Sequence, residues 1–299
     1  MLISKLGEFG LIERFNKRIK LDASVVRGSG DDCAVLAFNK NQFQLFTCDM
    51  IVEGVDFMAK TDPYLVGRKA IAVSISDIAS CAGTPRHCVV SLGLPRKSKV
   101  AFVDRLVSGM LDMARKYKIN IVGGDLSRAD KLVIDVSMLG IVEKKKLALR
   151  NQAKIGDIIF VTGSLGGSIR GKHLKFSPRL KEARQLTKRF KLHAMIDISD
   201  GLTQDLGHIL EQSKVGAVIY ENLIPVSRDA RDIKEALYMG EDFELLFTLS
   251  RADAKKLLRD RSGTYKPIGE IVERIYGLEL VNKHSGKKIL KIKGYQHFK

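Results

Sequence analysis

The chain has 299 residues, of which 45% are apolar and 28% are charged, and its formal net charge is +17. This length and composition fit one large or two medium globular domains. No apolar run approaches the ~18 residues that a membrane-spanning helix needs, which excludes that class of membrane protein. The first ten residues lack the layout of a signal peptide, so we expect a cytoplasmic protein.

The positive charge raises the question of a polyanionic partner, because basic surfaces attract nucleic acids. The excess is spread over residues 144–150, 170–191 and 283–299. Aromatic residues are not interleaved with it in a stacking pattern, and no nucleic-acid-binding motif is present. We therefore interpret the charge as a solvated basic surface that can also steer anionic substrates such as nucleotides.

The four cysteines give no metal-binding pattern. Cys33, Cys48, Cys81 and Cys88 form no C-x-x-C pair, which argues against zinc. All four lie in apolar runs, so we expect reduced cysteines in the core.

Apolar periodicity and turn residues predict two α/β halves that meet near residue 145. An amphipathic helix is expected over residues 3–18. The first half is then predicted to have strands at 33–38, 43–49, 87–94, 119–122 and 132–142, and helices at 64–82 and 98–118. The second half is predicted to have strands at 158–162, 244–249, 266–272 and 289–292, and helices at 178–190 and 252–261. The basic link 143–146 is the candidate domain boundary.

The stretch 195–207 carries the clearest sign of a functional site. It reads as a buried strand, a turn at Asp200-Gly201 and a helix with an apolar face. Asp197 and Asp200 thus fall at the C-terminal end of a buried strand, where α/β proteins place their sites. Since no Lys or Arg lies between His193 and Glu211, the counter-charge that these carboxylates need is best supplied by a metal ion.

Further aspartates lie at the edges of apolar elements: Asp31-Asp32, Asp49, Asp77 and Asp125. Asp77 is the only charged residue between Ala70 and Gly83, where an unpaired carboxylate is unfavourable. Asp77 can alternatively be an N-cap or pair with Arg68 or Arg86, and the other three places also keep an ordinary alternative. Asp31-Asp32 can form an Asx turn, Asp49 can be a strand-end turn residue, and Asp125 can follow a tight glycine turn.

Oxygen ligands in such number, without a histidine cluster, favour Mg²⁺ over zinc or iron. Several Mg²⁺ ions in turn imply a polyphosphate that shares them. Residues 166–173 match the spacing of a Walker A loop up to Lys172, but His173 replaces the Ser or Thr that should bind Mg²⁺. Gly28-Ser-Gly30 lacks the third glycine of a dinucleotide-binding fingerprint. We therefore expect neither phosphate loop.

Eight motifs, in order along the whole chain, resemble those of the thiamine-monophosphate kinase family. They are Gly30-Asp-Asp-Cys-Ala-Val-Leu, Cys48-Asp-Met-Ile-Val-Glu-Gly-Val-Asp-Phe, Ser76-Asp-Ile-Ala, Gly123-Gly-Asp, Arg150-Asn-Gln-Ala-Lys-Ile-Gly-Asp, Ile196-Asp-Ile-Ser-Asp-Gly-Leu, Gly240-Glu-Asp-Phe-Glu-Leu and Lys293-Gly-Tyr-Gln-His-Phe. The superfamily also contains aminoimidazole ribonucleotide synthetase and selenophosphate synthetase. The resemblance implies an α/β fold of the α+β type with two α/β domains. Residues 1–145 would bind ATP and Mg²⁺ and give a mixed sheet to a dimeric β-barrel, and residues 146–299, a sheet flanked by helices, would complete the cleft.

The resemblance also implies roles for individual residues. The implied metal contacts are Asp32, Thr47, Cys48, Asp49, Asp77, Asp125, Asp197 and Asp200. The implied ATP contacts are Gly124, Asp125, Arg150 and Ser199, and the implied substrate contacts are Asp56, Glu241 and Tyr295. Cys48 stands where the family commonly has Thr, Asp56 stands where it usually has His, and the loop after Val161-Thr-Gly is shortened.

The expected activity is transfer of the γ-phosphoryl group of ATP to thiamine monophosphate, giving thiamine diphosphate and ADP in a homodimer that uses several Mg²⁺ ions. A phosphate acceptor is already ionised near pH 7, so we assign no general base and no covalent nucleophile. Two alternatives stay open. Asp56 suggests an ATP-using relative with another small phosphorylated acceptor, and the +17 charge suggests a non-catalytic nucleotide- or nucleic-acid-binding protein.

Overall fold

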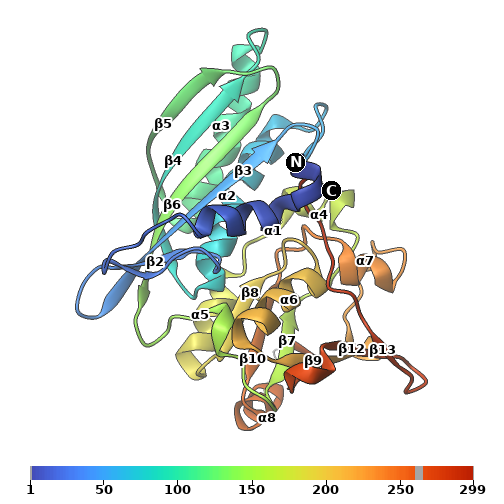
Figure 1. The fold of residues 1–299 in the computed structure, drawn as a ribbon. Coiled ribbons are helices and arrows are strands. Elements are labelled where there is room, and N and C mark those ends of the chain that lie inside the picture. The colour runs from blue at the N-terminus through green and yellow to red at the C-terminus, as the bar shows by residue number, and fades with distance from the viewer. Residues whose placement is uncertain (1, 260–264, 299) are drawn as a thin grey trace. The chain divides into compact units, whose positions relative to one another are not determined.

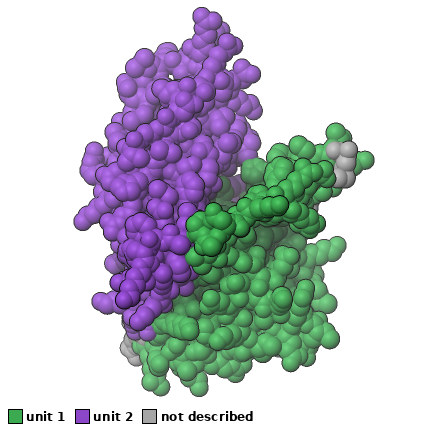
Figure 2. Space-filling model, turned by 60° about the vertical axis from the view of Figure 1, so that its left-hand side comes forward, with its two compact units in different colours: residues 1–31, 148–168, 190–299 green, residues 32–147, 169–189 purple. Residues whose placement is uncertain are grey.

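The computed structural model describes residues 2–259 and 265–298, and its chain divides into two compact units (Figure 2). Unit 1 comprises residues 1–31, 148–168 and 190–299, and unit 2 comprises residues 32–147 and 169–189. Each unit is thus assembled from segments that are distant in the sequence. Among the described residues, no helix combines the length and apolar character needed to cross a bilayer.

Unit 2 supplies five strands, in the order β2-β3-β6-β4-β5, of a six-stranded mixed sheet. Its strands are β2 (Ala34–Ala37), β3 (Gln42–Val52), β4 (Thr84–Leu94), β5 (Asn120–Arg128) and β6 (Val133–Glu143). Its helices are α2 (Pro63–Ser80), α3 (Val100–Tyr117), α4 (Lys172–Lys175) and α5 (Leu180–Arg189). The pairing is antiparallel except between β4 and β5, which run parallel.

The two faces of this sheet differ in how far other elements bury them. Helix α2 packs on the inner face, where Leu45, Ile134 and Val136 are fully buried (Figure 1). Side chains alternate between the faces of a strand, so neighbours such as Phe46 and Met50 point to the outer face, where 42% and 58% of their surfaces are exposed. The outer face of the unit 2 sheet therefore exposes large apolar side chains.

Unit 1 contains a second sheet with the order β13-β12-β9-β11-β7-β10-β8. Its strands are β7 (Ile158–Thr162), β8 (Ala194–Asp197), β9 (Gly216–Tyr220), β10 (Leu245–Leu249), β11 (Tyr265–Val272), β12 (Leu278–Val281) and β13 (Lys287–Ile289), and the short β1 (Val25–Arg27) precedes them in the chain. Its helices are α1 (Ile3–Asn16), α6 (Leu202–Ser213), α7 (Ile233–Tyr238) and α8 (Arg251–Arg259). Leu202, Leu206 and Ile209 join α6 to a core with β7, β8 and β10, as its apolar spacing predicts.

Some expectations from the sequence were wrong. Helix α1 is interrupted at Gly7, whose φ is 73°, and its expected apolar face is not buried, because Ile12 and Phe15 are 42% and 54% exposed. Cys48 is exposed, whereas the other three cysteines are buried as predicted. The helix expected over 252–261 is α8, and residues 260–261 lie outside the described residues.

Candidate active site

Strand β3 and helix α2 bring several oxygen donors together on the inner face of unit 2. Thr47 is buried there and its hydroxyl donates a hydrogen bond to the carboxylate of Asp77 on α2. A carboxylate oxygen of Asp32, which precedes β2, lies within 4.8 Å of one from Asp77. The hydroxyl of Ser74, one turn before Asp77, donates to Asp49 at 2.7 Å. Residues that are distant in the sequence thus come together within unit 2.

The electrostatics of this group favour a cation. Burial raises the pKa of Asp49 to about 6, and the nearby charges of Asp135 and Asp32 add to the rise, although the hydrogen bond from Ser74 opposes it. Carboxylates that repel one another in a buried setting are relieved by a bound cation. The group therefore has the charge that a metal site requires.

The kinds of donor indicate which cation fits. Asp32, Thr47, Asp49 and Asp77 offer only oxygen atoms, the ligands that Mg²⁺ prefers. The thiol of Cys33 is fully buried, and burial together with its neighbour Cys81 raises its pKa well above the ordinary value. A protonated thiol is a poor metal ligand, so a hard cation such as Mg²⁺ fits better than zinc.

Two of the expected metal contacts point elsewhere. The thiol of Cys48 faces the outer side of the sheet, where it donates to Asp135 at 3.1 Å. Its side chain is therefore not among the donors beside Asp77, and only its backbone could take part. Asp125 is exposed, and its carboxylate accepts from Ser127 at 3.3 Å.

The register explains where Asp125 lies. Asp125 pairs with Ser91, which pairs with Asp135, which pairs with Met50, so these four side chains share the outer face. Asp49 pairs with Val136 and lies on the inner face. Unit 2 therefore does not bring Asp125 to Asp49.

The two glycines before Asp125 also differ from expectation. They lie inside β5 and not in a turn. A Cβ atom at Gly124 would stand 1.8 Å from the carbonyl oxygen of Val90, so a side chain there would push β5 away from β4. Close packing of β5 against β4 thus requires glycine at position 124, whether or not Gly124 also contacts a nucleotide.

Asp56 is turned toward its own loop. Its carboxylate accepts from the backbone N–H of Val52 at 2.7 Å, and its carbonyl accepts from the ammonium group of Lys69 at 3.0 Å. Lys69 is fully buried in α2. This position, where the family usually has His, therefore closes the turn after β3.

In unit 1 the turn between β8 and α6 gathers the other expected residues. Asp197 ends β8 and is 2% exposed, and the chain then passes Ser199 and Asp200 before α6 starts. The carbonyl of Ser199 accepts from the N–H of Glu241 at 2.7 Å, and that of Asp200 accepts from the N–H of Tyr295 at 2.9 Å. Three chain segments thus meet at this turn.

The charges around Asp200 come from both ends of the chain, which lie side by side (Figure 1). Burial raises the pKa of Asp200 to about 6; Glu8 and Glu241 raise it further, whereas His297 and Arg150 lower it. The backbone N–H of His297 donates to the Glu8 carboxylate at 3.0 Å. Sequence reasoning missed Glu8 and His297, because only the fold brings the two termini together.

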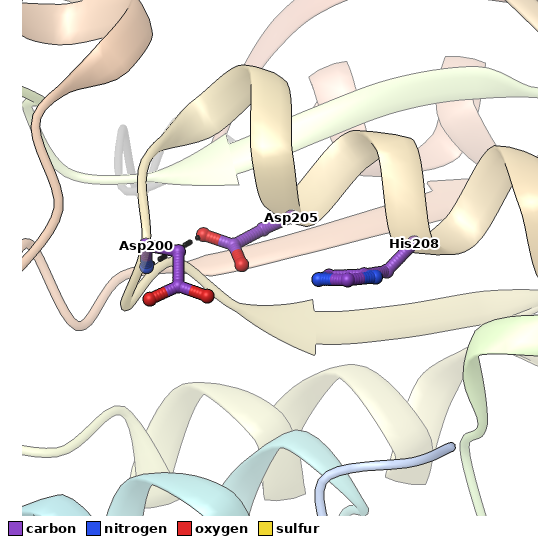
Figure 3. A group of neighbouring side chains, drawn as sticks. All are labelled: Asp200, Asp205 and His208. Atoms are coloured by element: carbon purple, nitrogen blue, oxygen red, sulfur yellow. Dashed lines mark hydrogen bonds between the residues drawn. The ribbon is translucent and has the colours of Figure 1, made fainter. Parts of the chain in front are cut away.

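Asp205 and His208 extend along α6 beside Asp200 (Figure 3). Ligand atoms of the three side chains lie within 4.8 Å of one another. Asp205 turns back to the start of the helix, where it accepts from the N–H groups of Asp200 and Gly201 at 3.1 and 3.0 Å. It is 2% exposed, so it is a buried cap of the helix and not a solvent-facing residue.

Two buried carboxylates of the Gly240–Leu245 motif hold the loop after β7. Asp242, which is fully buried, accepts from the N–H of Gly166 at 2.9 and 3.0 Å and from the hydroxyl of Ser168. Glu244 accepts from the hydroxyl of Thr162 at 2.7 Å. The N–H of Gly166, the first glycine of the Walker A spacing, is therefore bonded to a carboxylate of the chain itself, which argues against a phosphate loop.

The chain matches two family models that together cover most of its length. The AIR synthase related protein N-terminal domain matches residues 30–142, and the AIR synthase related protein C-terminal domain matches residues 151–279. With two α/β units and acidic groups on each, the chain is of the AIR synthase related class.

Similar proteins of known family identify the family within this class. Thiamine-monophosphate kinase of Buchnera aphidicola subsp. Schizaphis graminum is 35% identical over 98% of this chain and 99% of the relative, and that of Bacillus subtilis is 34% identical over 98% and 100%. A solved structure described as "AaThiL complexed with AMPPCP and TMP" is 30% identical, with a TM-score of 0.86 over 99% of both chains. The chain belongs to the thiamine-monophosphate kinase family.

Proposed function

We propose that this protein is an ATP:thiamine-monophosphate phosphotransferase that produces thiamine diphosphate and ADP. The observation that carries the proposal is the match of the whole chain to a structure that holds AMPPCP, an ATP analogue, together with TMP. The oxygen-only donors around Asp77 supply the chemistry that such a reaction needs. Both reactants are anions, so the main barrier is the approach of like charges.

We propose that Asp32, Thr47, Asp49 and Asp77 of unit 2, with the Cys48 backbone, hold Mg²⁺, and that Asp197 and Asp200 of unit 1 do the same. Bound Mg²⁺ neutralises negative charge on phosphate oxygens and aligns them for in-line transfer. Thr47 and Ser74 fix the carboxylates of Asp77 and Asp49 through hydrogen bonds. Asp125, on the outer face, is proposed as a ligand or nucleotide contact together with Gly124.

Arg150 and Ser199 are the proposed nucleotide contacts of unit 1. The positive charge of Arg150 acts on Asp200, so it is close enough to offset the negative charge of this turn. Glu241 and Tyr295, which bond to the same turn through their backbones, are the proposed acceptor contacts. Glu241 has a φ of 69°, a left-handed conformation that an L-residue rarely adopts, and such strain is concentrated at functional sites.

A coupled assay of ADP release tests the function. With ATP, Mg²⁺ and thiamine monophosphate, we expect ADP and thiamine diphosphate in equal amounts, and no turnover with excess EDTA. Thiamine without its phosphate is the matched control and should give only background. ADP release that is unaffected by thiamine monophosphate would contradict the proposal.

Asp56, where the family usually has His, leaves open a second function in which another phosphorylated molecule accepts the phosphoryl group. Because its carboxylate caps Val52, it offers less to a substrate than an imidazole would. A panel of other phosphorylated metabolites in the same assay separates the two functions. Turnover with a panel member and none with thiamine monophosphate would favour an enzyme with a different acceptor.

We also propose that residues 1–145 carry the dimerisation surface, and that this surface is the outer face of the unit 2 sheet. Phe46, Met50 and Val89 are 42%, 58% and 39% exposed on it. Val89 pairs with Ser137, which pairs with Cys48, so these apolar side chains share one face. An uncovered apolar sheet face is suited to a second copy, and joining two such sheets is the step toward a shared barrel.

The double variant Phe46→Lys/Met50→Lys should be monomeric in sedimentation velocity at concentrations where the unchanged protein is dimeric. Placing two ammonium groups per subunit in an apolar interface removes its hydrophobic contribution and adds repulsion between copies. Met58→Lys is the control, because Met58 is 61% exposed in the loop after β3. A double variant that stays dimeric would place the interface elsewhere.

A further inference from the structure

A pocket of about 320 Å³ lies on unit 2, between the C-terminal end of α3 and helix α5. Tyr117, Leu180, Lys181, Arg184, Gln185 and Lys188 line it. This volume is at the lower end of the range for small-molecule sites, about 300 to 1,000 Å³. None of the lining residues belongs to the acidic groups proposed for phosphoryl transfer, so the pocket is built from a separate set of residues.

Three cations of the pocket share one face of α5. Lys181, Arg184 and Lys188 follow a spacing of three and four residues, which places them in line along the helix. The only acidic residue of α5 is Glu182, and its carboxylate is paired with Arg179 at 3.2 Å. Within the described parts of the chain, no carboxylate forms an ion pair with any of the three, so their charge is uncompensated.

A hydrogen bond fixes the guanidinium group of Arg184, although a neighbouring positive charge repels it. Its guanidinium donates to the hydroxyl of Thr84, at the start of β4, at 3.0 Å. Partial burial and the neighbouring charge of Arg86 lower the pKa of Arg184. Two guanidinium groups brought together without a carboxylate favour an anion, and the planar guanidinium of Arg can donate to two phosphate oxygens at once.

The other side of the pocket is apolar and aromatic. Leu180 is 4% exposed, and the ring of Tyr117 is partly buried beside it. Burial raises the pKa of Tyr117, so its phenol is neutral near pH 7. A flat ring can therefore pack against Tyr117 and Leu180 while anionic groups reach the cations of α5.

We propose that this pocket binds a nucleoside phosphate, with its base against Tyr117 and Leu180 and its phosphates on Lys181, Arg184 and Lys188. A hollow of this small volume with one aromatic wall suits a small molecule better than an extended nucleic acid strand. The site contains no carboxylate, so the binding is independent of metal ions. This distinguishes it from the Mg²⁺-dependent site of the proposed reaction.

Isothermal titration with ADP in excess EDTA tests the inference. The unchanged protein should bind ADP without metal, and the Lys181→Gln/Arg184→Gln/Lys188→Gln variant should bind it at least tenfold more weakly. The kcat of this variant with ATP, Mg²⁺ and thiamine monophosphate should change less than twofold. Lys20→Gln/Lys60→Gln/Lys255→Gln is the matched control, since these lysines are exposed elsewhere and their loss changes the net charge equally.

Three results would overturn the proposal. If ADP does not bind in excess EDTA, a metal-independent nucleotide site is excluded. If the control triple variant loses as much ADP affinity as the α5 variant, the effect is one of general charge. A labelled single-stranded RNA that binds the protein but not the α5 variant, together with no binding of ADP, assigns the patch to nucleic acid instead. Each result leaves the test of the proposed kinase activity unaffected, because that activity is measured separately.

Discussion

In the Asp77→Asn protein, kcat should fall by about 10²- to 10³-fold while the fold is retained. Asp77 accepts from Thr47 and lies within 4.8 Å of Asp32, so it is central to the donor group of unit 2. Asparagine keeps the size of the side chain and an oxygen that can accept from Thr47. It removes the negative charge, which is what a divalent cation requires of this position.

Two measurements separate loss of metal binding from loss of structure. The Mg²⁺ concentration for half-maximal activity should rise, and the unfolding temperature in EDTA should not fall, because one of several repelling carboxylates has been removed. Asp104→Asn is the control, since Asp104 is an exposed carboxylate on α3 of the same unit. Near-normal kcat in Asp77→Asn at ordinary Mg²⁺ concentration would exclude Asp77 from the site.

The parts of the site that local patterns could predict are those within single elements. The stretch from Met195 to Gly207 is a buried strand, a turn and an amphipathic helix, because alternation and helical spacing are local properties. Asp77 was identifiable in the same way, as the only charged residue in the apolar stretch between Ala70 and Gly83. Strand β7, Ile158–Thr162, matches its predicted limits for the same reason.

The parts that were missed depend on register and on contacts between distant segments. The face on which Asp125 lies is set by the pairing of β4 with β5, whose register shifts between Cys88 and Val89. A one-residue shift moves a side chain to the other face, and no local pattern records it. Glu8 and His297 meet through a hydrogen bond from the His297 N–H to the Glu8 carboxylate, across nearly the whole chain, and no local pattern records such a contact. Strand β9 was not predicted either.

Asp242→Ala should have the largest effect on stability, lowering the free energy of unfolding by about 3 kcal/mol. Asp242 is fully buried, and its carboxylate accepts from the N–H of Gly166 and the hydroxyl of Ser168. Alanine leaves both donors without this partner and leaves a cavity as well. The unfolding temperature should fall by about 6 to 12 °C for a protein of this size.

Asp242→Ala should also alter the candidate active site. Asp242 directly follows Glu241, whose backbone N–H donates a hydrogen bond to the carbonyl of Ser199. If the proposed role of Glu241 is right, KM for thiamine monophosphate rises in Asp242→Ala more than kcat falls. Asp242→Asn keeps one acceptor for Gly166, so its stability should lie between those of the unchanged protein and Asp242→Ala. This variant preserves the test if the alanine variant does not fold.

The control is Asp229→Ala. Asp229 is an exposed carboxylate beside the same loop, and its loss should change the free energy of unfolding by less than about 0.5 kcal/mol. Equal unfolding temperatures for Asp242→Ala and Asp229→Ala would show that the buried carboxylate does not hold the loop.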